Sequence, residues 1–386
     1  MTKNILIIDD SALMRRVLSD IINADERFQV TEVAINGLDA LEILQNRGKD
    51  FDGVILDVNM PKMNGIELLE KLQEKKIKAT IIIVSTIAKK DAKETIRALE
   101  LGAFDFVTKP ESYLEVKSNQ FSDNILRCLS TATKAEALEL KVEQKTEPKR
   151  ESKTEPKTEP KTEPKITITE RPESIKPSAR SLGKKVAKQL PHNATKLVAL
   201  ACSTGGPKAL HMVIPSLPKN LDASVLIVQH MPEGFTKSLA DRLNEISEIK
   251  VKEAEDGETL VKGCVYIAKG GYQMRLVKHV DGQYKISITK EAARHGLLPC
   301  ADIMYESLIE TEFDQITCVV LTGMGGDGTA GITKLDKKKN TYVIAQNEET
   351  CIVYGMPKVI KDAGLVDEVV ALGDVASAIT KNVGVY

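Results

Sequence analysis

The chain has 386 residues, with 54 lysines and arginines against 55 aspartates and glutamates. This length exceeds one ordinary hydrophobic core, so we expect two domains. The balanced charge gives no reason to expect binding to nucleic acid or to an anionic membrane. The six cysteines form no CxxC pair, and no apolar stretch approaches the roughly 20 residues that span a bilayer. We therefore expect a monomeric cytoplasmic protein with reduced thiols, no nucleic-acid partner and no direct membrane insertion.

Residues 1–130 alternate short apolar runs with amphipathic stretches, which is typical of a parallel sheet whose strands are connected by helices. A polar residue follows or ends each of several apolar runs; these residues are Asp9 and Asp10, Asp57, Ser85 and Lys109. In a parallel sheet the carboxyl ends of the strands share one edge, where ligands bind. The sequence therefore predicts that these five side chains gather at that edge.

An amphipathic helix is expected after the first apolar run. Leu13, Val17, Leu18 and Ile21 recur there at helical spacing. The pattern predicts that all four side chains pack on the sheet.

Three of the gathered residues are carboxylates, which repel one another unless a cation lies between them. Oxygen ligands with room for water suit Mg²⁺. Such an ion would also neutralise a phosphoryl group on Asp57, whose oxygens Lys109 could pair with. Asp9 and Asp10 alone would be better explained as a helix cap, but five matched positions favour a phosphorylation site.

Four segments of this region, LIIDDSALMRRVL, ILDVNMPKMNG, IIVSTIAKKDA and GAFDFVTKP, resemble the receiver domain of two-component response regulators. The resemblance covers essentially all of residues 1–130 and implies a flavodoxin-like fold. It implies phosphorylation of Asp57 by a histidine kinase. It also implies that Mg²⁺ binds Asp10, Asp57 and the backbone carbonyl of Asn59, with Asp9 close by.

The same resemblance implies a conformational switch. Ser85 would move toward the phosphoryl group, Phe106 would be the aromatic side chain that follows it, and Lys109 would contact the phosphoryl oxygens. The family often has threonine and tyrosine where this chain has Ser85 and Phe106, so both substitutions are conservative.

Residues 131–191 are predicted to form a flexible linker. Within them the tetrapeptide Lys-Thr-Glu-Pro recurs, and hydrophobic residues that could form a core are missing from the repeat. Proline prevents helix continuation, and so polar a segment cannot offset the entropy of ordering. The repeat is too short for a solenoid unit, so we interpret it as a solvated spacer.

Residues 192–386 are predicted to form a second α/β domain with a mostly parallel sheet. Its strand-like runs are KLVALA, SVLIVQ, CVYIA, TCVVLT and TYVIAQ, and helix-like stretches separate several of them. The stretch MRLVKHVDGQYKISIT indicates an antiparallel hairpin that turns at Asp281 and Gly282.

A serine, a histidine and an aspartate follow three of these runs: Ser203, His230 and Asp327. A serine hydroxyl is a poor nucleophile unless a base removes its proton. His230 could be that base, and Asp327 could orient its ring and stabilise the imidazolium. The order Ser, His, Asp along the chain differs from the orders in the α/β-hydrolases, chymotrypsin and subtilisin, but such sites are defined by geometry.

Glycines accompany both the serine and the aspartate. Gly205 and Gly206 would leave the space above Ser203 open and permit a sharp turn into a helix, whose N-terminal amides favour negative charge. Each feature also has a simpler explanation, because Ser203 or Thr204 could be a helix N-cap. The glycine-rich GMGGDG segment around Asp327 could equally be a phosphate-binding loop or a turn.

Three other histidines compete for the role of base. His211 falls in a predicted helix, where a packed or surface position is expected, and His279 falls beside the hairpin turn, where we expect it to be exposed. His295 is the main rival of His230.

The segments ALACSTGGPKAL, VLIVQHMPEGFTKSLADRLN and VVLTGMGGDGTAG resemble the catalytic domain of chemotaxis protein-glutamate methylesterases, which also carry an N-terminal receiver. The resemblance implies Ser203 as nucleophile, His230 as general base and Asp327 as the residue that orients it. Thr204 would support the histidine, and the backbone N–H of Met324 would help to form the oxyanion hole. No cofactor is implied for this domain.

Two departures from the family are visible. This chain has Pro299-Cys300-Ala301-Asp302 where the family more often has Pro-Ser-Val-Asp, and its linker is unusually long. The first departure lies outside the proposed triad, so we expect it to affect substrate contacts rather than the reaction.

The resemblance as a whole implies a phosphorylation-activated hydrolase for chemotactic adaptation. Its substrates would be glutamate methyl esters, and also glutamines, on the cytoplasmic helices of chemoreceptors. The unphosphorylated receiver is predicted to lie over the catalytic edge. The alternative is a response regulator whose second domain binds a nucleotide or a protein without chemistry.

Overall fold

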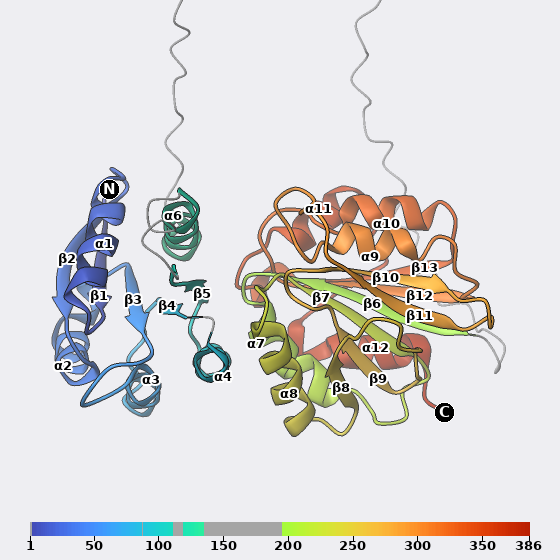
Figure 1. Cartoon of the computed structure of the whole chain (residues 1–386), viewed down its shortest axis with the longest axis horizontal. Helices are drawn as coiled ribbons and strands as arrows, with labels where there is room; N and C mark the ends of the chain where they lie inside the picture. The colour runs from blue at the N-terminus through green and yellow to red at the C-terminus, as the bar shows by residue number, and fades with distance from the viewer. Residues whose placement is uncertain (1, 87, 111–118, 135–194) are drawn as a thin grey trace, which may run out of the picture.

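The computed structural model describes residues 2–86, 88–110, 119–134 and 195–386, which form two α/β units (Figure 1). Most of the predicted linker, residues 131–191, lies outside the described residues. Within the described ranges, no helix combines the length and apolarity required to span a bilayer.

The N-terminal unit contains a five-stranded parallel sheet. Its strands are β1 (Lys3–Ile8), β2 (Phe28–Ala34), β3 (Gly53–Asp57), β4 (Ile81–Ser85) and β5 (Asp105–Thr108). The order β2-β1-β3-β4-β5 is that of flavodoxin-like proteins. The prediction of a flavodoxin-like receiver fold is therefore confirmed.

Helices cover both faces of this sheet. They are α1 (Ala12–Asn23), α2 (Gly37–Arg47) followed by the 3₁₀ turn η1 (Gly48–Asp50), α3 (Gly65–Glu74), α4 (Lys89–Glu100) and α6 (Asn119–Thr133). Helices α1 and α6 share one apolar cluster, whereas α2, α3 and α4 contribute to another. Buried aliphatic side chains of the strands fill both clusters.

The apolar face of α1 differs from the prediction. Leu18 and Ile22 are fully buried, whereas the side chain of Leu13 is 68% exposed. At 100° per residue, Leu13 lies about 140° around the helix from Leu18 and on the opposite side from Ile22. The first turn of α1 therefore presents this leucine to solvent.

The C-terminal unit contains a seven-stranded parallel sheet. Its strands are β6 (Lys196–Cys202), β7 (Ser224–Gln229), β8 (Lys250–Glu253), β9 (Cys264–Ile267), β12 (Gln315–Val320), β13 (Thr341–Gln346) and β14 (Glu368–Val370). Their order is β14-β13-β12-β6-β7-β9-β8, so β6 lies between β12 and β7 at the centre. The carboxyl ends of these three strands carry the predicted triad.

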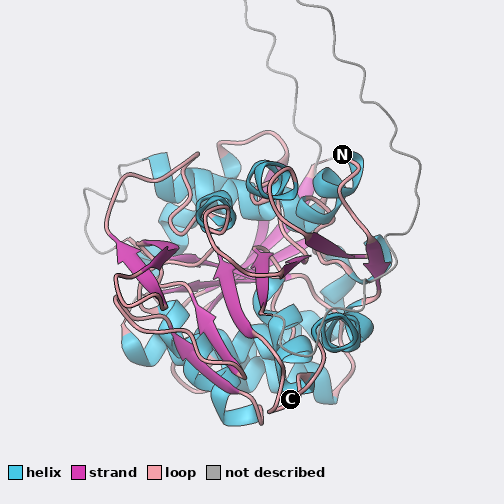
Figure 2. Cartoon of the chain, turned by 90° about the vertical axis from the view of Figure 1, so that its right-hand side faces the viewer, coloured by secondary structure: helices cyan, strands magenta, loops and turns pink. Residues whose placement is uncertain are grey.

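The predicted hairpin is present as β10 (Gln273–Lys278) and β11 (Tyr284–Thr289), which form a separate two-stranded antiparallel sheet. The remaining elements are α7 (Gly206–Val213), η2 (Ile214–Ser216), α8 (Phe235–Ile246), α9 (Ala301–Ser307), α10 (Thr329–Asp336), η3 (Glu348–Thr350), α11 (Met356–Asp362), η4 (Leu372–Asp374) and α12 (Val375–Val383). Helices α9, α10 and α11 cover one face of the main sheet and α7, α8 and α12 the other (Figures 1 and 2).

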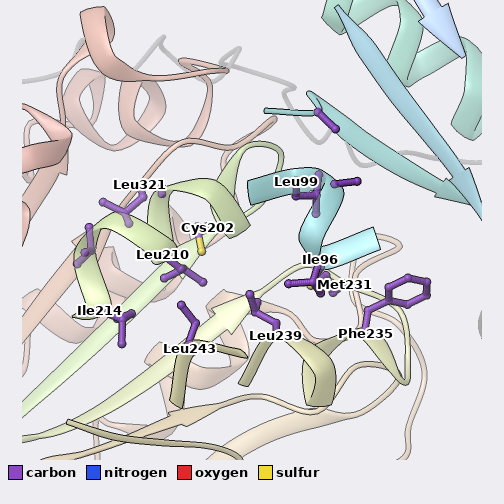
Figure 3. Packing of buried hydrophobic residues seen from close by; sticks show 14 of the residues in the cluster. Ile96, Leu99, Cys202, Leu210, Ile214, Met231, Phe235, Leu239, Leu243 and Leu321 are labelled. Carbon is purple, nitrogen blue, oxygen red and sulfur yellow. The ribbon is translucent and has the colours of Figure 1, made fainter. Parts of the chain in front are cut away.

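The two units meet through α4, which packs against α7 and α8. In Figure 3 Ile96 of α4 lies between Leu239 and Phe235 of α8, with Leu99 further along α4, and all four belong to one buried apolar cluster. Next to this cluster, Glu100 accepts a hydrogen bond from Arg242 Nε at 2.6 Å. Apolar packing and an ion pair thus hold the receiver on the catalytic unit.

Candidate active site

Ser203 lies directly after the central strand β6. Its N–H donates to the carbonyl of Thr322 at 3.1 Å, and its own carbonyl accepts from the N–H of Gly206 at 2.7 Å. The second bond closes a tight turn into α7. The strand end therefore holds the Ser203 backbone firmly at the carboxyl edge of the sheet.

The two glycines after Ser203 are required by close packing rather than by the open space that we expected. Gly205 has φ of +77°, and a Cβ atom there would lie 2.7 Å from Cβ of Ile352. A Cβ atom on Gly206 would overlap Oε1 of Gln229 and lie 3.0 Å from Cβ of Cys202. Side chains larger than hydrogen would force the turn apart.

His230 follows β7, and its ring contacts Asp327 in the loop after β12. Nε2 of His230 lies 2.8 Å from Oδ2 of Asp327, and only 12% and 5% of the two side chains are exposed. Burial alone would raise the pKa of Asp327, but the histidine and backbone N–H groups lower it to about 2. This carboxylate is therefore ionised, and Nδ1 of the ring remains free of it.

The Asp327 carboxylate is also held by the start of α9 and by Gly328, which directly precedes α10. It accepts hydrogen bonds from the N–H groups of Ala301 at 2.6 Å, Asp302 at 3.0 Å and Gly328 at 3.0 Å, and from the Cys300 thiol at 3.1 Å. We expected the Pro299–Asp302 segment to affect substrate contacts only. The structure instead places it directly against the aspartate of the predicted triad.

Ser203, His230 and Asp327 line one cleft of about 580 Å³, together with Thr204 and Met324. Across the part of the chain that the structure describes, no hydrogen bond joins the Ser203 hydroxyl to His230. Catalytic hydrogen bonds are often long in ligand-free structures and shorten when substrate binds. The structure therefore brings the three predicted residues together with the serine hydroxyl not yet engaged.

The receiver forms the other wall of this cleft, through β5 and α6. The hydroxyl of Thr204 donates to Oδ2 of Asp105 at 2.8 Å, so its predicted support of the histidine is not seen in this arrangement. Burial raises the pKa of Asp105, and the Thr204 hydrogen bond only partly opposes the rise. A carboxylate of the receiver thus reaches a residue of the candidate active site.

Met324 follows β12 in the glycine-rich loop. Its N–H donates to no other backbone group in the described ranges, whereas the N–H groups of Gly355 and Met356 both donate to the carbonyl of Gly323 beside it. These bonds fix the loop and leave the Met324 N–H available for an oxyanion.

The three histidines that compete with His230 occupy different places in the structure. His211 packs at the domain boundary, with Nε2 2.7 Å from Oε1 of Glu100, and the side chain of His279 is 46% exposed beside Asp281. His295 is exposed at the rim of the cleft and makes no hydrogen bond to Asp327. Of the histidines near the cleft, His230 is the one that contacts Asp327.

The acidic edge of the receiver is assembled as predicted from the strand ends. Oxygen atoms of Asp9, Asp10 and Asp57 lie within 4.8 Å of one another. Nζ of Lys109 lies 3.0 Å from Asp9 and 2.8 Å from Asp57. Burial raises the pKa of Asp57, and the nearby lysine and the N–H of Asn59 oppose the rise. A cluster of hard oxygen donors with excess negative charge fits Mg²⁺.

The predicted switch residues lie on β4 and β5. Ser85 is buried at the end of β4, and its hydroxyl donates to the carbonyl of Thr86 at 3.4 Å. Phe106 points toward the catalytic unit, where its ring centroid lies 4.6 Å from that of Phe235. The aromatic side chain of the receiver thus forms part of the contact between the units.

Comparison with known proteins agrees with this architecture. The response regulator receiver domain family matches residues 5–118, and the CheB methylesterase family matches residues 198–379. A protein-glutamate methylesterase/protein-glutamine glutaminase of Bacillus subtilis is 38% identical, over 97% of both chains. The protein-glutamate methylesterase/protein-glutamine glutaminase 1 of Syntrophomonas wolfei is 36% identical over 98% of both chains. The chain belongs to this family.

A solved structure of the Thermotoga maritima CheB methylesterase catalytic domain is 41% identical and covers 49% of this chain and 98% of that chain, with a TM-score of 0.47. The full-length relatives and the two family matches confirm the recognition of a receiver joined to a methylesterase-family domain.

Two contributors to the site were missed at the level of sequence. Cys300 lies 27 residues before Asp327, and Asp105 lies in the other domain. The departure from the family pattern at Cys300 was the available signal for the first. The signal for Asp105 was its charge within the apolar run FDFVT, which otherwise predicts a buried strand.

Proposed function

We propose that this protein is a phosphorylation-activated serine hydrolase of chemotactic adaptation. Its substrates are glutamate γ-methyl esters, and also glutamines, on the cytoplasmic helices of chemoreceptors. The products are glutamate with methanol or ammonia. The observation that carries the proposal is the buried His230–Asp327 pair at 2.8 Å in the cleft that Ser203 also lines. The names of the full-length relatives supply the substrate class.

In the proposed reaction, the Ser203 hydroxyl attacks the ester carbonyl while His230 removes its proton. Because Nε2 faces Asp327, Nδ1 is the atom that accepts the proton. The protonated ring then gives this proton to the leaving methoxide, which departs as methanol. Water, deprotonated by the same nitrogen, hydrolyses the acyl-enzyme and restores the serine.

The negative charge on the carbonyl oxygen is stabilised by backbone N–H groups. Met324 supplies one, and a single donor of this kind contributes about 3 kcal/mol to transition-state stabilisation. Thr204 stands next to the nucleophile, where its hydroxyl can support the histidine once Asp105 has left. Substrate entry and this support therefore both need the receiver to move.

The receiver controls the reaction through phosphorylation of Asp57 by a chemotaxis histidine kinase. Asp10, Asp57 and the backbone carbonyl of Asn59 would hold Mg²⁺, with Asp9 close by, and the bound ion would neutralise charge on the phosphoryl group. Lys109 already contacts Asp57 and would pair with the phosphoryl oxygens.

Ser85 and Phe106 would transmit the change. Movement of Ser85 toward the phosphoryl group would leave space behind it. The Phe106 side chain would turn into this space and lose its contact with the Phe235 ring. Loss of this ring contact would weaken the hold of the receiver on the catalytic unit, and displacement of the receiver would then break the hydrogen bond between Asp105 and Thr204. Phosphorylation would thus open the cleft.

The activity is tested by methanol release from the methylated cytoplasmic part of a chemoreceptor. We expect Ser203→Ala to reduce the rate by at least about 10³-fold, while phosphorylation of Asp57 persists. An unchanged rate would show that Ser203 is not the nucleophile, and a wild-type protein that releases no methanol would favour a binding domain without chemistry.

The control by the receiver is tested on the full chain with and without a small-molecule phosphodonor. Arg242→Ala removes the ion pair with Glu100 and should raise the rate without phosphodonor several-fold. Arg275→Ala, which breaks an ion pair within the catalytic unit, is the matched control. Equal rates in all samples would contradict inhibition by the receiver.

A further inference from the structure

The two oxygens of the Asp327 carboxylate have different partners. Oδ2 accepts hydrogen bonds from His230 and from the N–H of Ala301. Oδ1 accepts from the N–H groups of Asp302 and Gly328 and from the Cys300 thiol. The donors on Oδ1 fix the rotation of the carboxylate and thereby point Oδ2 at the histidine ring.

Cys300 differs from the other donors because it acts through a side chain. Apart from this thiol and the histidine ring, the described donors to Asp327 are backbone N–H groups, which substitution leaves in place. Cys300 is fully buried, and burial together with the charge of Asp327 raises the pKa of its thiol to about 12. The thiol therefore keeps its proton and remains a donor.

The position of Cys300 is itself fixed by the hairpin. Its N–H donates to Oε1 of Gln273 at 2.8 Å, and Nε2 of the same glutamine donates to the carbonyl of Leu297 at 3.1 Å. Gln273 begins β10 and is fully buried. The thiol thus approaches Asp327 from a rigid support.

Asp302 completes the surroundings of this carboxylate. Its Oδ1 accepts from the N–H groups of Gly328 at 3.0 Å and Gly331 at 2.6 Å. Ligand atoms of Cys300, Asp302 and Asp327 lie within 4.8 Å of one another. Because backbone N–H groups already occupy the carboxylates, this cluster is a hydrogen-bonded support and not a metal site.

We propose that Cys300 is a positioning residue for the ester hydrolysis: its thiol holds the Asp327 carboxylate toward His230 and sets how strongly that carboxylate supports the imidazolium. The inference rests on the hydrolase function proposed above. A thiol is a weaker donor than a hydroxyl, so Cys300 orients the carboxylate while withdrawing little of its negative charge. A serine at this position withdraws more charge, and an alanine withdraws none.

The test is the dependence of kcat/KM on pH for methanol release by the full chain with phosphodonor, since its acidic limb reports protonation of the base. Cys300→Ser should move the midpoint of this limb to lower pH, and Cys300→Ala to higher pH, each by about half a pH unit, the size of one weak hydrogen bond. Cys300→Ala should also lower kcat about 3- to 10-fold with little change in KM. Cys264→Ser, a buried thiol on β9, should leave the midpoint unchanged.

A purely structural role would lower the rates of both Cys300 variants without moving either midpoint, and this result overturns the inference. Shifts in the same direction for Ser and Ala overturn it as well. Thermal unfolding of each variant gives the folded fraction used to correct the rates. A wild-type protein that releases no methanol would remove the proposed function, whereas an active wild type with unmoved midpoints removes only the role of Cys300.

Discussion

The two sheet edges of this protein stabilise buried carboxylates in opposite ways. In the receiver, Asp57 has Lys109 and the N–H of Asn59 as partners, and burial raises its pKa. In the catalytic unit, Asp327 accepts five hydrogen bonds, and its pKa falls to about 2. Both carboxylates lie at the carboxyl end of a parallel sheet, so the fold alone does not determine the difference.

The difference corresponds to the proposed chemistry. A carboxylate that forms a bond to phosphorus needs an oxygen that donors do not occupy. A carboxylate that only orients a histidine works best when its rotation is fixed and its charge is permanent. The number of N–H donors around each aspartate is therefore the structural feature that separates a phosphoacceptor from an orienting group.

The largest expected effect is that of Asp327→Asn. An amide at this position turns an N–H₂ group toward backbone N–H donors and removes the charge that stabilises the imidazolium, so we expect kcat to fall about 10⁴-fold. Methanol release measures the loss, with Asp241→Asn, at a half-buried carboxylate of α8 that pairs with Lys237, as the control. A variant retaining a tenth of the wild-type rate would contradict the assigned role.

At the other edge, Asp57→Asn should abolish the response to phosphodonor but keep the rate without phosphodonor within about twofold of wild type, because the catalytic unit is untouched. Rates measured with and without phosphodonor test this. Asp52→Asn, in an ion pair with Lys3 at the start of β1, should respond as the wild type does. Persistent stimulation of the Asp57→Asn variant would show that the receiver acts by another route.

Gly206→Ala tests the packing that holds the turn after Ser203. The added methyl group overlaps Oε1 of Gln229, so we expect the free energy of unfolding to fall by about 3 kcal/mol and the rate to fall with it. Chemical denaturation measures the first effect. Gly373→Ala, where a Cβ atom meets open space, serves as the control and should change stability little.

The smallest effect concerns acid stability. Because the pKa of Asp327 is lower in the folded protein than in the unfolded chain, its contribution is present above about pH 4 and is lost as the pH falls toward 2. The loss amounts to about 2 kcal/mol. Unfolding of wild type and Asp327→Asn from pH 5 to 2 should show a steeper decline for wild type, and parallel curves would contradict the low pKa.

Much of this architecture follows from the sequence. The apolar runs predicted the central strands of both sheets because fully buried parallel strands are continuously apolar. Strands β2, β8 and β14 were missed, since Phe28–Ala34 and Lys250–Glu253 contain several polar residues and Glu368–Val370 has three residues. These are the edge strands, where burial imposes the weakest pattern.

The site shows the same limit. Ser203, His230 and Asp327 could be proposed because each follows a strand whose end is predictable. Contacts that depend on how helices and domains pack, such as those of Cys300 and Asp105 with the catalytic edge, leave no periodic signal. The sequence marks both residues as unusual, but only three-dimensional packing shows what they contact.

The hydrogen bond between Thr204 and Asp105 has one more consequence. Aspartate carries the same functional group that the proposed reaction creates on its substrate, so the closed enzyme already holds an internal analogue of its own product. In the proposed cycle the returning receiver would reclaim this hydroxyl from His230 and refill the emptied cleft with its own carboxylate.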